Sequence, residues 1–183
     1  MDILFITPMI LLYAILYGIT MKVADLFNEH GLKPWFKGAN LLFGVLWGLF
    51  GALLILGDII IANIILAMNI AFIIRRRIDY LNHAVAISII IITFLFWGSI
   101  DITLFLIFFF IFLAFGGLKD YVDDVLKKKE GLFYNLNEAM LYYPIPTFIY
   151  CLIYGNLIVF YVFLIYTVAY DVTKLIGAKA GYP

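Results

Sequence analysis

Long apolar runs constrain this fold more than any other feature of the sequence. A helix needs about 20 apolar residues to cross the hydrocarbon of a bilayer. Most of the apolar runs approach that length, and two are short: residues 3–20, 39–56, 59–74, 84–98, 102–116, 145–154 and 157–170. Lipid offers free backbone groups no hydrogen bonds, so each run is predicted to be helical despite its many β-branched and aromatic residues. The sequence predicts an all-α, polytopic transmembrane helix bundle that forms a single domain over residues 1–183.

The composition excludes a water-soluble fold. Hydrophobic residues make up 66% of the chain and charged residues only 13%, whereas about a quarter of a typical soluble domain is charged. A soluble core of this size could not bury runs of this length. The formal net charge is zero, and no basic stretch is interleaved with aromatic residues, which argues against a nucleic-acid partner. The single cysteine, Cys151, excludes an intrachain disulfide and a cysteine-rich metal site.

Three short polar joints between apolar runs predict helical hairpins. These joints are residues 57–58, 98–101 and 155–156, and each contains residues that favour tight turns. The third hairpin has an alternative, because residues 147–170 could instead form one long tilted helix. The hairpin interpretation gives seven spans, whereas the alternative gives six and places the C-terminus on the other side.

The basic residues predict the orientation of the bundle. When seven segments alternate across the bilayer, all 12 Lys and Arg fall on one side: Lys22, Lys33, Lys37, Arg75, Arg76, Arg77, Lys119, Lys127, Lys128, Lys129, Lys174 and Lys179. The positive-inside rule makes that side cytoplasmic. We therefore expect a multi-pass protein of the cell membrane with its N-terminus outside and its C-terminus in the cytoplasm.

A short acidic pattern recurs at the start of each cytoplasmic connection. It consists of Asp, two apolar residues and then Asn or Asp, and it occurs as Asp25 with Asn28, Asp79 with Asn82, and Asp120 with Asp123. Further polar residues follow in helical register: Glu29 and His30, His83, and Asp124. Residues four apart share a helix face, so each pattern is predicted to present two ligands in one direction. The predicted pairs are Asp25 with Glu29, Asp79 with His83, and Asp120 with Asp124.

These residues are candidates for a metal and substrate site if the helix ends converge. Oxygen-rich sets suit Mg²⁺ better than zinc. The candidate metal ligands are Asp25, Glu29, Asp79, Asp120, Asp123 and Asp124. The candidate substrate-binding residues are Asn28, His30, Arg76, Asn82, His83 and Lys119. The alternative interpretation is that each polar residue only solvates the end of a helix.

Two further features predict contacts rather than chemistry. Residues 118–142 form the longest cytoplasmic segment, whose amphipathic pattern predicts that it lies partly along the lipid headgroups. Its run of three lysines predicts a contact with anionic membrane lipids. Gly44, Gly48 and Gly51 have near-helical spacing and predict close helix packing.

The stretch from Lys119 to Asp124, followed by Lys127–Lys129 and Gly131, resembles the second acidic motif of UbiA-type prenyltransferases. Members of that family bind a polyprenyl diphosphate through Mg²⁺ at two Asp-rich cytoplasmic loops. The resemblance implies that Asp120, Asp123 and Asp124 hold metal and that Lys and Arg side chains bind the diphosphate. It also implies an apolar tunnel for the prenyl chain.

The leading functional hypothesis is a membrane protein that uses Mg²⁺ to act on a lipid or polyprenyl phosphate, as a transferase would. No soluble-enzyme motif is present in the sequence. One alternative is a small transporter or channel built from hairpin repeats. Against it, the predicted helix interiors contain no Asp, Glu, Lys or Arg, which ion-coupled carriers often place within the membrane. A non-catalytic subunit of a membrane complex is the third possibility.

Overall fold

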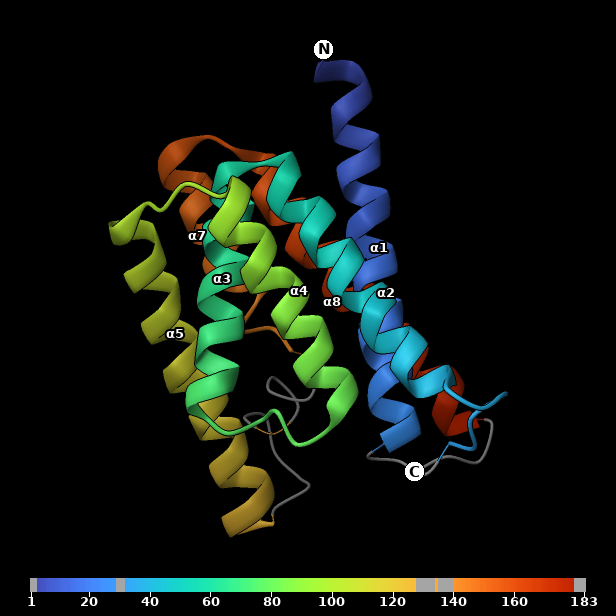
Figure 1. Ribbon diagram of the computed structural model, residues 1–183. Coiled ribbons are helices and arrows are strands. Elements are labelled where there is room, and N and C mark those ends of the chain that lie inside the picture. The colour runs from blue at the N-terminus through green and yellow to red at the C-terminus, as the bar shows by residue number, and fades with distance from the viewer. Residues whose placement is uncertain (1–2, 29–31, 128–133, 135–139, 180–183) are drawn as a thin grey trace.

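The computed structural model describes residues 3–28, 32–127, 134 and 140–179, and these ranges contain helices and turns but no strand. In chain order the elements are α1 (Ile3–Asn28), α2 (Ala39–Gly57), α3 (Ile59–Ile74), α4 (Leu81–Trp97), α5 (Ile102–Asp120), the π-helix η1 (Tyr121–Leu126), α7 (Pro144–Tyr154) and α8 (Leu157–Lys179). Helix α1 packs against α2 and α8, α2 against α4, and α3 against α5 (Figure 1). The predicted all-α bundle is confirmed.

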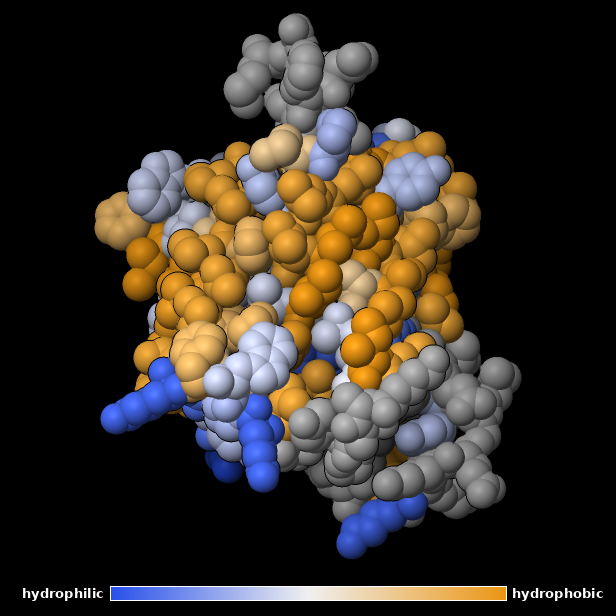
Figure 2. Space-filling model, turned by 90° about the vertical axis from the view of Figure 1, so that its right-hand side faces the viewer, coloured by the Kyte–Doolittle hydropathy of each residue, from blue (hydrophilic) through white to orange (hydrophobic). Residues whose placement is uncertain are grey.

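Four of the helices, α1, α2, α5 and α8, are long and apolar enough to cross a membrane. Helices α3, α4 and α7 are apolar but shorter. A band of hydrophobic side chains covers the middle of the face in Figure 2, and strongly hydrophilic side chains project at its lower end. A surface of this kind is stable in lipid, and the chain is a membrane protein.

Tight turns join the helices where the sequence predicts hairpins. Asp58 alone separates α2 from α3, and its Oδ1 accepts hydrogen bonds from the backbone of Ile60 and Ile61 at 2.8 and 3.0 Å. Gly155, with a φ of 76°, lies between α7 and α8, so the alternative of one continuous helix over residues 147–170 is wrong. These turns lie at the same end of the bundle as the start of α1, and α8 ends at the other end (Figure 1).

The turn between α4 and α5 is held by a buried asparagine of α3. Asn63 Nδ2 donates to the carbonyl of Ser99 at 2.9 Å, and the backbone N–H of Asp101 donates to Asn63 Oδ1 at 2.9 Å. Asp101 in turn caps α5 by accepting from the N–H of Leu104 at 3.0 Å. Asn63 thereby fixes the turn of the α4–α5 hairpin to a helix of the α2–α3 hairpin.

The predicted close packing at the glycines of α2 is confirmed. A Cβ on Gly44 would lie 2.5 Å from the backbone oxygen of Asn82, and one on Gly48 would lie 3.0 Å from the Cα of Ala86. A Cβ on Gly51 would lie 2.7 Å from Cδ1 of Ile90. The three glycines therefore allow α4 to lie directly against α2, and this contact sets the position of the first turn of α4.

The segment that precedes α7 is buried in the bundle at its C-terminal end. Within residues 118–142, Met140 and Tyr142 are described and buried, and they belong to the main hydrophobic core together with Tyr143. The ring of Tyr143 packs against Phe112 of α5 and Tyr166 of α8 at centroid distances of 5.3 and 5.5 Å. This end of the segment therefore lies inside the bundle, and the expectation that part of the segment lies along the headgroups stays a prediction.

Candidate functional site

Helix α1 continues well beyond the apolar run that predicts it. The run ends at Thr20, but α1 extends to Asn28 and carries Lys22 and Asp25 in its last turns. Both charged residues are buried, with 4% and 6% of their surface exposed. The sequence-based placement of Asp25 in a cytoplasmic connection is therefore wrong, because α1 continues three residues beyond it.

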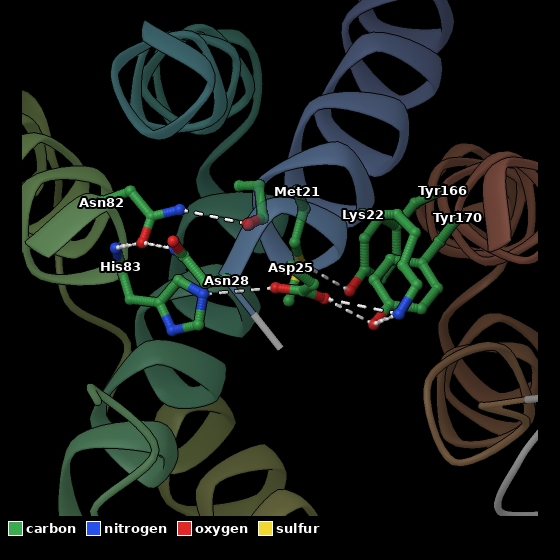
Figure 3. A network of polar contacts seen from close by, with 9 residues as sticks. Met21, Lys22, Asp25, Asn28, Asn82, His83, Tyr166 and Tyr170 are labelled. Carbon is green, nitrogen blue, oxygen red and sulfur yellow. Dashed lines mark hydrogen bonds and ion pairs between the residues drawn. The ribbon is translucent and has the colours of Figure 1, made fainter. Parts of the chain in front are cut away.

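Asp25 is surrounded by three polar partners from three helices (Figure 3). Its Oδ1 lies 3.3 Å from Nε2 of His83 in the first turn of α4. Its Oδ2 accepts a hydrogen bond of 2.7 Å from the hydroxyl of Tyr170 in α8 and lies 3.9 Å from the Nζ of Lys22. Lys22 Nζ also donates to that hydroxyl at 3.3 Å. The carboxylate of Asp25 therefore lies at the centre of a compact group of polar side chains.

The first and second acidic patterns meet through their asparagines. Asn28 Nδ2 donates to Asn82 Oδ1 at 2.6 Å, and Asn82 Nδ2 donates to the carbonyl of Ala24 at 3.2 Å. Asn82 Oδ1 also accepts from the N–H of His83 at 2.9 Å, which orients the start of α4. We call Lys22, Asp25, Asn28, Asn82, His83 and Tyr170 the α1–α4–α8 cluster.

Aromatic side chains enclose the imidazole of His83. Trp47 of α2 and Tyr80 contact it edge to face, with ring centroids 5.6 and 5.5 Å away. Only 5% of His83 is exposed. An imidazole held by a carboxylate on one side and by aromatic rings on the others can bind a proton in a fixed orientation.

Asp120 belongs to a separate group at the end of α5. Arg75 of α3 donates to both of its oxygens, from Nε at 2.8 Å and from Nη2 at 2.7 Å, and Arg77 also donates to Oδ1. We call these three residues the arginine clamp. Gly116 makes room for it, because a Cβ there would lie 2.0 Å from Nη1 of Arg75. Such bidentate pairing is among the stronger charged contacts.

Asp79 and Arg76 make none of the contacts that define these two groups. Asp79 is exposed and lies before α4, which begins at Leu81, so the prediction that Asp79 and His83 share a helix face is wrong. Arg76 is exposed with a φ of 58°, and Lys119 is half-buried in the last turn of α5. Glu29 and His30 lie outside the described residues, as do the side chains of Asp123 and Asp124.

A Mg²⁺ site is not assembled within the part of the chain that the structure describes. No group of three or more His, Cys, Asp or Glu residues there could hold a metal ion. The carboxylates of Asp25 and Asp120 already hold basic or hydroxyl partners, and such partners compete with a metal. These two groups therefore do not fit Mg²⁺ in this conformation.

Sequence reasoning did not single out Tyr170, although it contacts both Asp25 and Lys22. The available signal was the spacing of Tyr166 and Tyr170, which places two hydroxyls on one face of α8. The Tyr166 hydroxyl lies 3.3 Å from the sulfur of Met21, one turn before Asp25. Tyrosines in a membrane helix are commonly interpreted as interfacial anchors, so a contact between a tyrosine and a buried carboxylate is not expected from sequence.

No protein-family model matches the chain, and comparisons with curated proteins and with solved structures gave no match. The resemblance of residues 119–131 to UbiA-type prenyltransferases therefore stays a prediction. The contacts of the α1–α4–α8 cluster and of the arginine clamp are the features of the chain that indicate function.

Proposed function

We propose that the chain crosses the membrane seven times, with its N-terminus outside and its C-terminus in the cytoplasm. The turns at the N-terminal end carry Asp58 and Asp101 but no basic residue, which supports this orientation by the positive-inside rule. With 11 residues, α7 is about 16 Å long, about half the thickness of the hydrocarbon. The buried residues Met140, Tyr142 and Tyr143 complete that crossing, since irregular backbone is tolerated at membrane depth when protein encloses it.

The same proposal assigns the α1–α4–α8 cluster as the site that binds and acts on the phosphate end of a lipid or polyprenyl phosphate. The observation that carries it is the contact of Asp25 with His83, inside helices apolar enough for lipid. Burying ionisable groups in membrane helices is costly, so such groups usually have a function. The arrangement also joins two of the three acidic patterns at one end of the bundle.

Five of the six side chains of the cluster have a role in this proposal. Lys22 supplies positive charge for a phosphate oxygen, and Asp25 orients the imidazole of His83. His83 then serves as the general acid or base, since an imidazole oriented by a carboxylate is suited to proton transfer. The amides of Asn28 and Asn82 hold α1 and α4 together beside it.

A requirement for Mg²⁺ remains a sequence-based prediction. Its support is the number of carboxylates in the three acidic patterns, including Glu29, Asp123 and Asp124. Mg²⁺ bound beside a phosphate would neutralise its charge. The roles given to Lys22, Asp25 and His83 do not depend on it.

Binding of a soluble prenyl diphosphate tests the proposal. Purified protein in lipid nanodiscs is titrated with farnesyl diphosphate, with farnesol as the control for apolar partitioning, in Mg²⁺ and in EDTA. Asp25→Asn and His83→Gln are expected to weaken diphosphate binding at least about tenfold, as loss of a charged hydrogen bond does. Asp101→Asn, at the opposite end, keeps the cap of α5 and is the matched control. Equal binding by all variants, or no binding by the wild type, contradicts the proposal.

A transporter is the second candidate, and one observation favours it. Lys22, Asp25 and His83 lie within helices, and chains of such groups carry protons in pumps and carriers. Against it, α3 fills the middle of the bundle with buried apolar side chains such as Ile61, Ile65 and Met68. Proton flux into vesicles that contain the protein, lost in Asp25→Asn, would favour transport over catalysis.

A further inference from the structure

Helix α3 is followed by three consecutive arginines, and the backbone there forms a common helix-ending motif. The N–H of Arg77 donates to the carbonyl of Phe72, and the N–H of Arg76 donates to that of Ile73, each at 3.0 Å. This Schellman motif places Arg76 in the left-handed region, with a φ of 58°. Glycine is the usual residue at that position, because a side chain there strains the backbone. The chain instead holds an arginine in this strained conformation.

The three arginine side chains have different surroundings. Arg75 and Arg77 both donate to Asp120 in the arginine clamp, and only 9% of the Arg75 side chain is exposed. The Arg77 side chain is 38% exposed, so it is accessible from outside while Asp120 holds it. Arg76 is exposed and takes no part in the clamp. The outer side of the clamp therefore presents positive charge.

Acidic residues do not cancel this charge. Residues 75–79 and 119–120 contain four basic residues and two acidic ones, Asp79 and Asp120. Lys119 directly precedes Asp120 in the last turn of α5, and α5 packs against α3. The ends of these two helices therefore carry an excess of two positive charges at one location.

Exposed apolar side chains occupy the same two helix ends. Ile73 and Ile74 are exposed in the last turn of α3. Phe115 and Leu118 are exposed in the last turns of α5, which lies beside α3 (Figure 1). A membrane supplies acyl chains to cover such side chains and headgroups to meet the basic residues next to them.

This combination of groups selects an anionic phospholipid. A guanidinium group pairs with phosphate oxygens through two parallel N–H donors, which makes arginine a strong phosphate ligand. A zwitterionic phospholipid brings a cation of its own close to the arginines, whereas an anionic one does not. A soluble phosphate would leave the apolar side chains of α3 and α5 without a partner.

We propose that Arg76 and Arg77 bind the phosphate of an anionic phospholipid whose acyl chains lie along α3 and α5. Asp120 keeps Arg77 in position by accepting its hydrogen bond, and Lys119 adds positive charge from α5. The strained backbone of Arg76 is explained by this role, because a glycine there would bind no phosphate. The site is separate from the α1–α4–α8 cluster, and it does not depend on the function proposed for that cluster.

Native mass spectrometry of the purified full chain tests the site. The protein is released from detergent that contains phosphatidylglycerol or phosphatidylcholine with the same acyl chains. The wild type should bind phosphatidylglycerol about tenfold more tightly, and Arg76→Gln should lose at least about fivefold, as expected for a charged hydrogen bond. Lys37→Gln is the matched control and should bind like the wild type. Lys37 is also exposed, and it lies in the connection between α1 and α2 at the same end of the bundle (Figure 1).

Three outcomes of this experiment overturn the proposal. Arg76→Gln could bind phosphatidylglycerol as well as the wild type does, or Lys37→Gln could lose as much as Arg76→Gln. In the second case the lipid responds only to the general positive charge at this end of the bundle. The third outcome concerns glycerol 3-phosphate, which has the headgroup phosphate without acyl chains. It should not displace the lipid, and displacement would show that the site binds soluble phosphates instead.

Arg76→Gly separates lipid binding from folding, because the two effects have opposite signs. Glycine suits a φ of 58°, so the variant should melt about 2–4 °C above the wild type in phosphatidylcholine nanodiscs. Adding phosphatidylglycerol should raise the melting temperature of the wild type but not that of Arg76→Gly. An equal rise in both proteins overturns the proposal. A variant that melts below the wild type in phosphatidylcholine also overturns it, because Arg76 would then serve the fold rather than a lipid.

Discussion

The side-chain amide of Asn28 donates a hydrogen bond of 2.6 Å to the side-chain oxygen of Asn82, joining the last turn of α1 to the first turn of α4. The two residues occupy the same position in two copies of one sequence pattern and are 54 residues apart. Their contact brings the Asp25 side of α1 against the His83 side of α4. It is the main reason to interpret the recurrence as a shared site rather than as repeated helix ends.

Replacement of Asn82 tests how much this junction contributes to stability. Asn82→Leu removes the partner of Asn28 and leaves the carbonyl of Ala24 without its donor. The free energy of unfolding should fall by about 2–3 kcal/mol, as expected when buried polar groups lose their partners. Thermal unfolding in detergent measures the change. Asn40→Leu is the matched control, because Asn40 Oδ1 accepts from the N–H of its neighbour Leu41 and from no other described residue, and it should stay within about 0.5 kcal/mol of the wild type.

The ion pair of Lys22 and Asp25 predicts a non-additive pair of substitutions. Asp25→Leu removes the carboxylate that lies 3.9 Å from the buried ammonium of Lys22 and should cost about 3–5 kcal/mol of stability. The double variant Lys22→Met with Asp25→Leu should recover much of that loss, because neither charge is then left unmatched. A double variant no more stable than Asp25→Leu would show that the two charges do not interact.

Two adjacent glycines of α5 should respond in opposite directions. Gly116→Ala places a Cβ within 2.4 Å of the Cζ of Arg75, so it should push the guanidinium off Asp120 and lower stability by about 1–3 kcal/mol. Gly117→Ala meets no atom within 4 Å and should gain up to about 1 kcal/mol of helix propensity. Thermal unfolding of the two variants measures both stability changes. Equal changes would mean that Arg75 is not held at Gly116.

Helix α2 positions the start of α4, which predicts an effect of Gly44 on ligand binding. Gly44→Ala places a Cβ 2.5 Å from the backbone oxygen of Asn82, a rigid neighbour, so α4 must move away from α2. We expect farnesyl diphosphate binding to weaken by about as much as in His83→Gln, although no side chain of the α1–α4–α8 cluster is changed. Binding that matches the wild type would show that the cluster tolerates this shift.

The helices and their turns could be predicted from the sequence because lipid imposes a simple rule. A long apolar segment in lipid must form a helix, because its backbone groups have no other hydrogen-bond partners. Asp58, Asp101 and Gly155 interrupt the apolar segments at the turns. The end of α1 could not be predicted this way. Lys22 and Asp25 have the composition of a loop, but they pair with each other and with His83 inside the bundle, so the helix continues.

The candidate site could be predicted only in part. Asp25, Asn28, Asn82 and His83 come together as the repeated pattern suggests, whereas Asp120 pairs with Arg75 and Arg77. Sequence spacing along one helix cannot reveal which helices become neighbours, and α5 packs against α3 rather than α1. The role of Tyr170 was hidden for the same reason, because α8 meets α1 only through the fold.

The basic residues between α1 and α2 and between α3 and α4 are predicted to lie on the same side of the membrane as the α1–α4–α8 cluster. This placement is tested most directly by labelling single cysteines with an impermeant maleimide, after replacing the buried Cys151 by Ala. Ser99→Cys should react in intact cells, whereas Lys33→Cys and Arg76→Cys should react only in inside-out vesicles. Reaction of Lys33→Cys and Arg76→Cys from opposite faces would contradict the account, since α1 and α4 could then not present their polar ends to the same water.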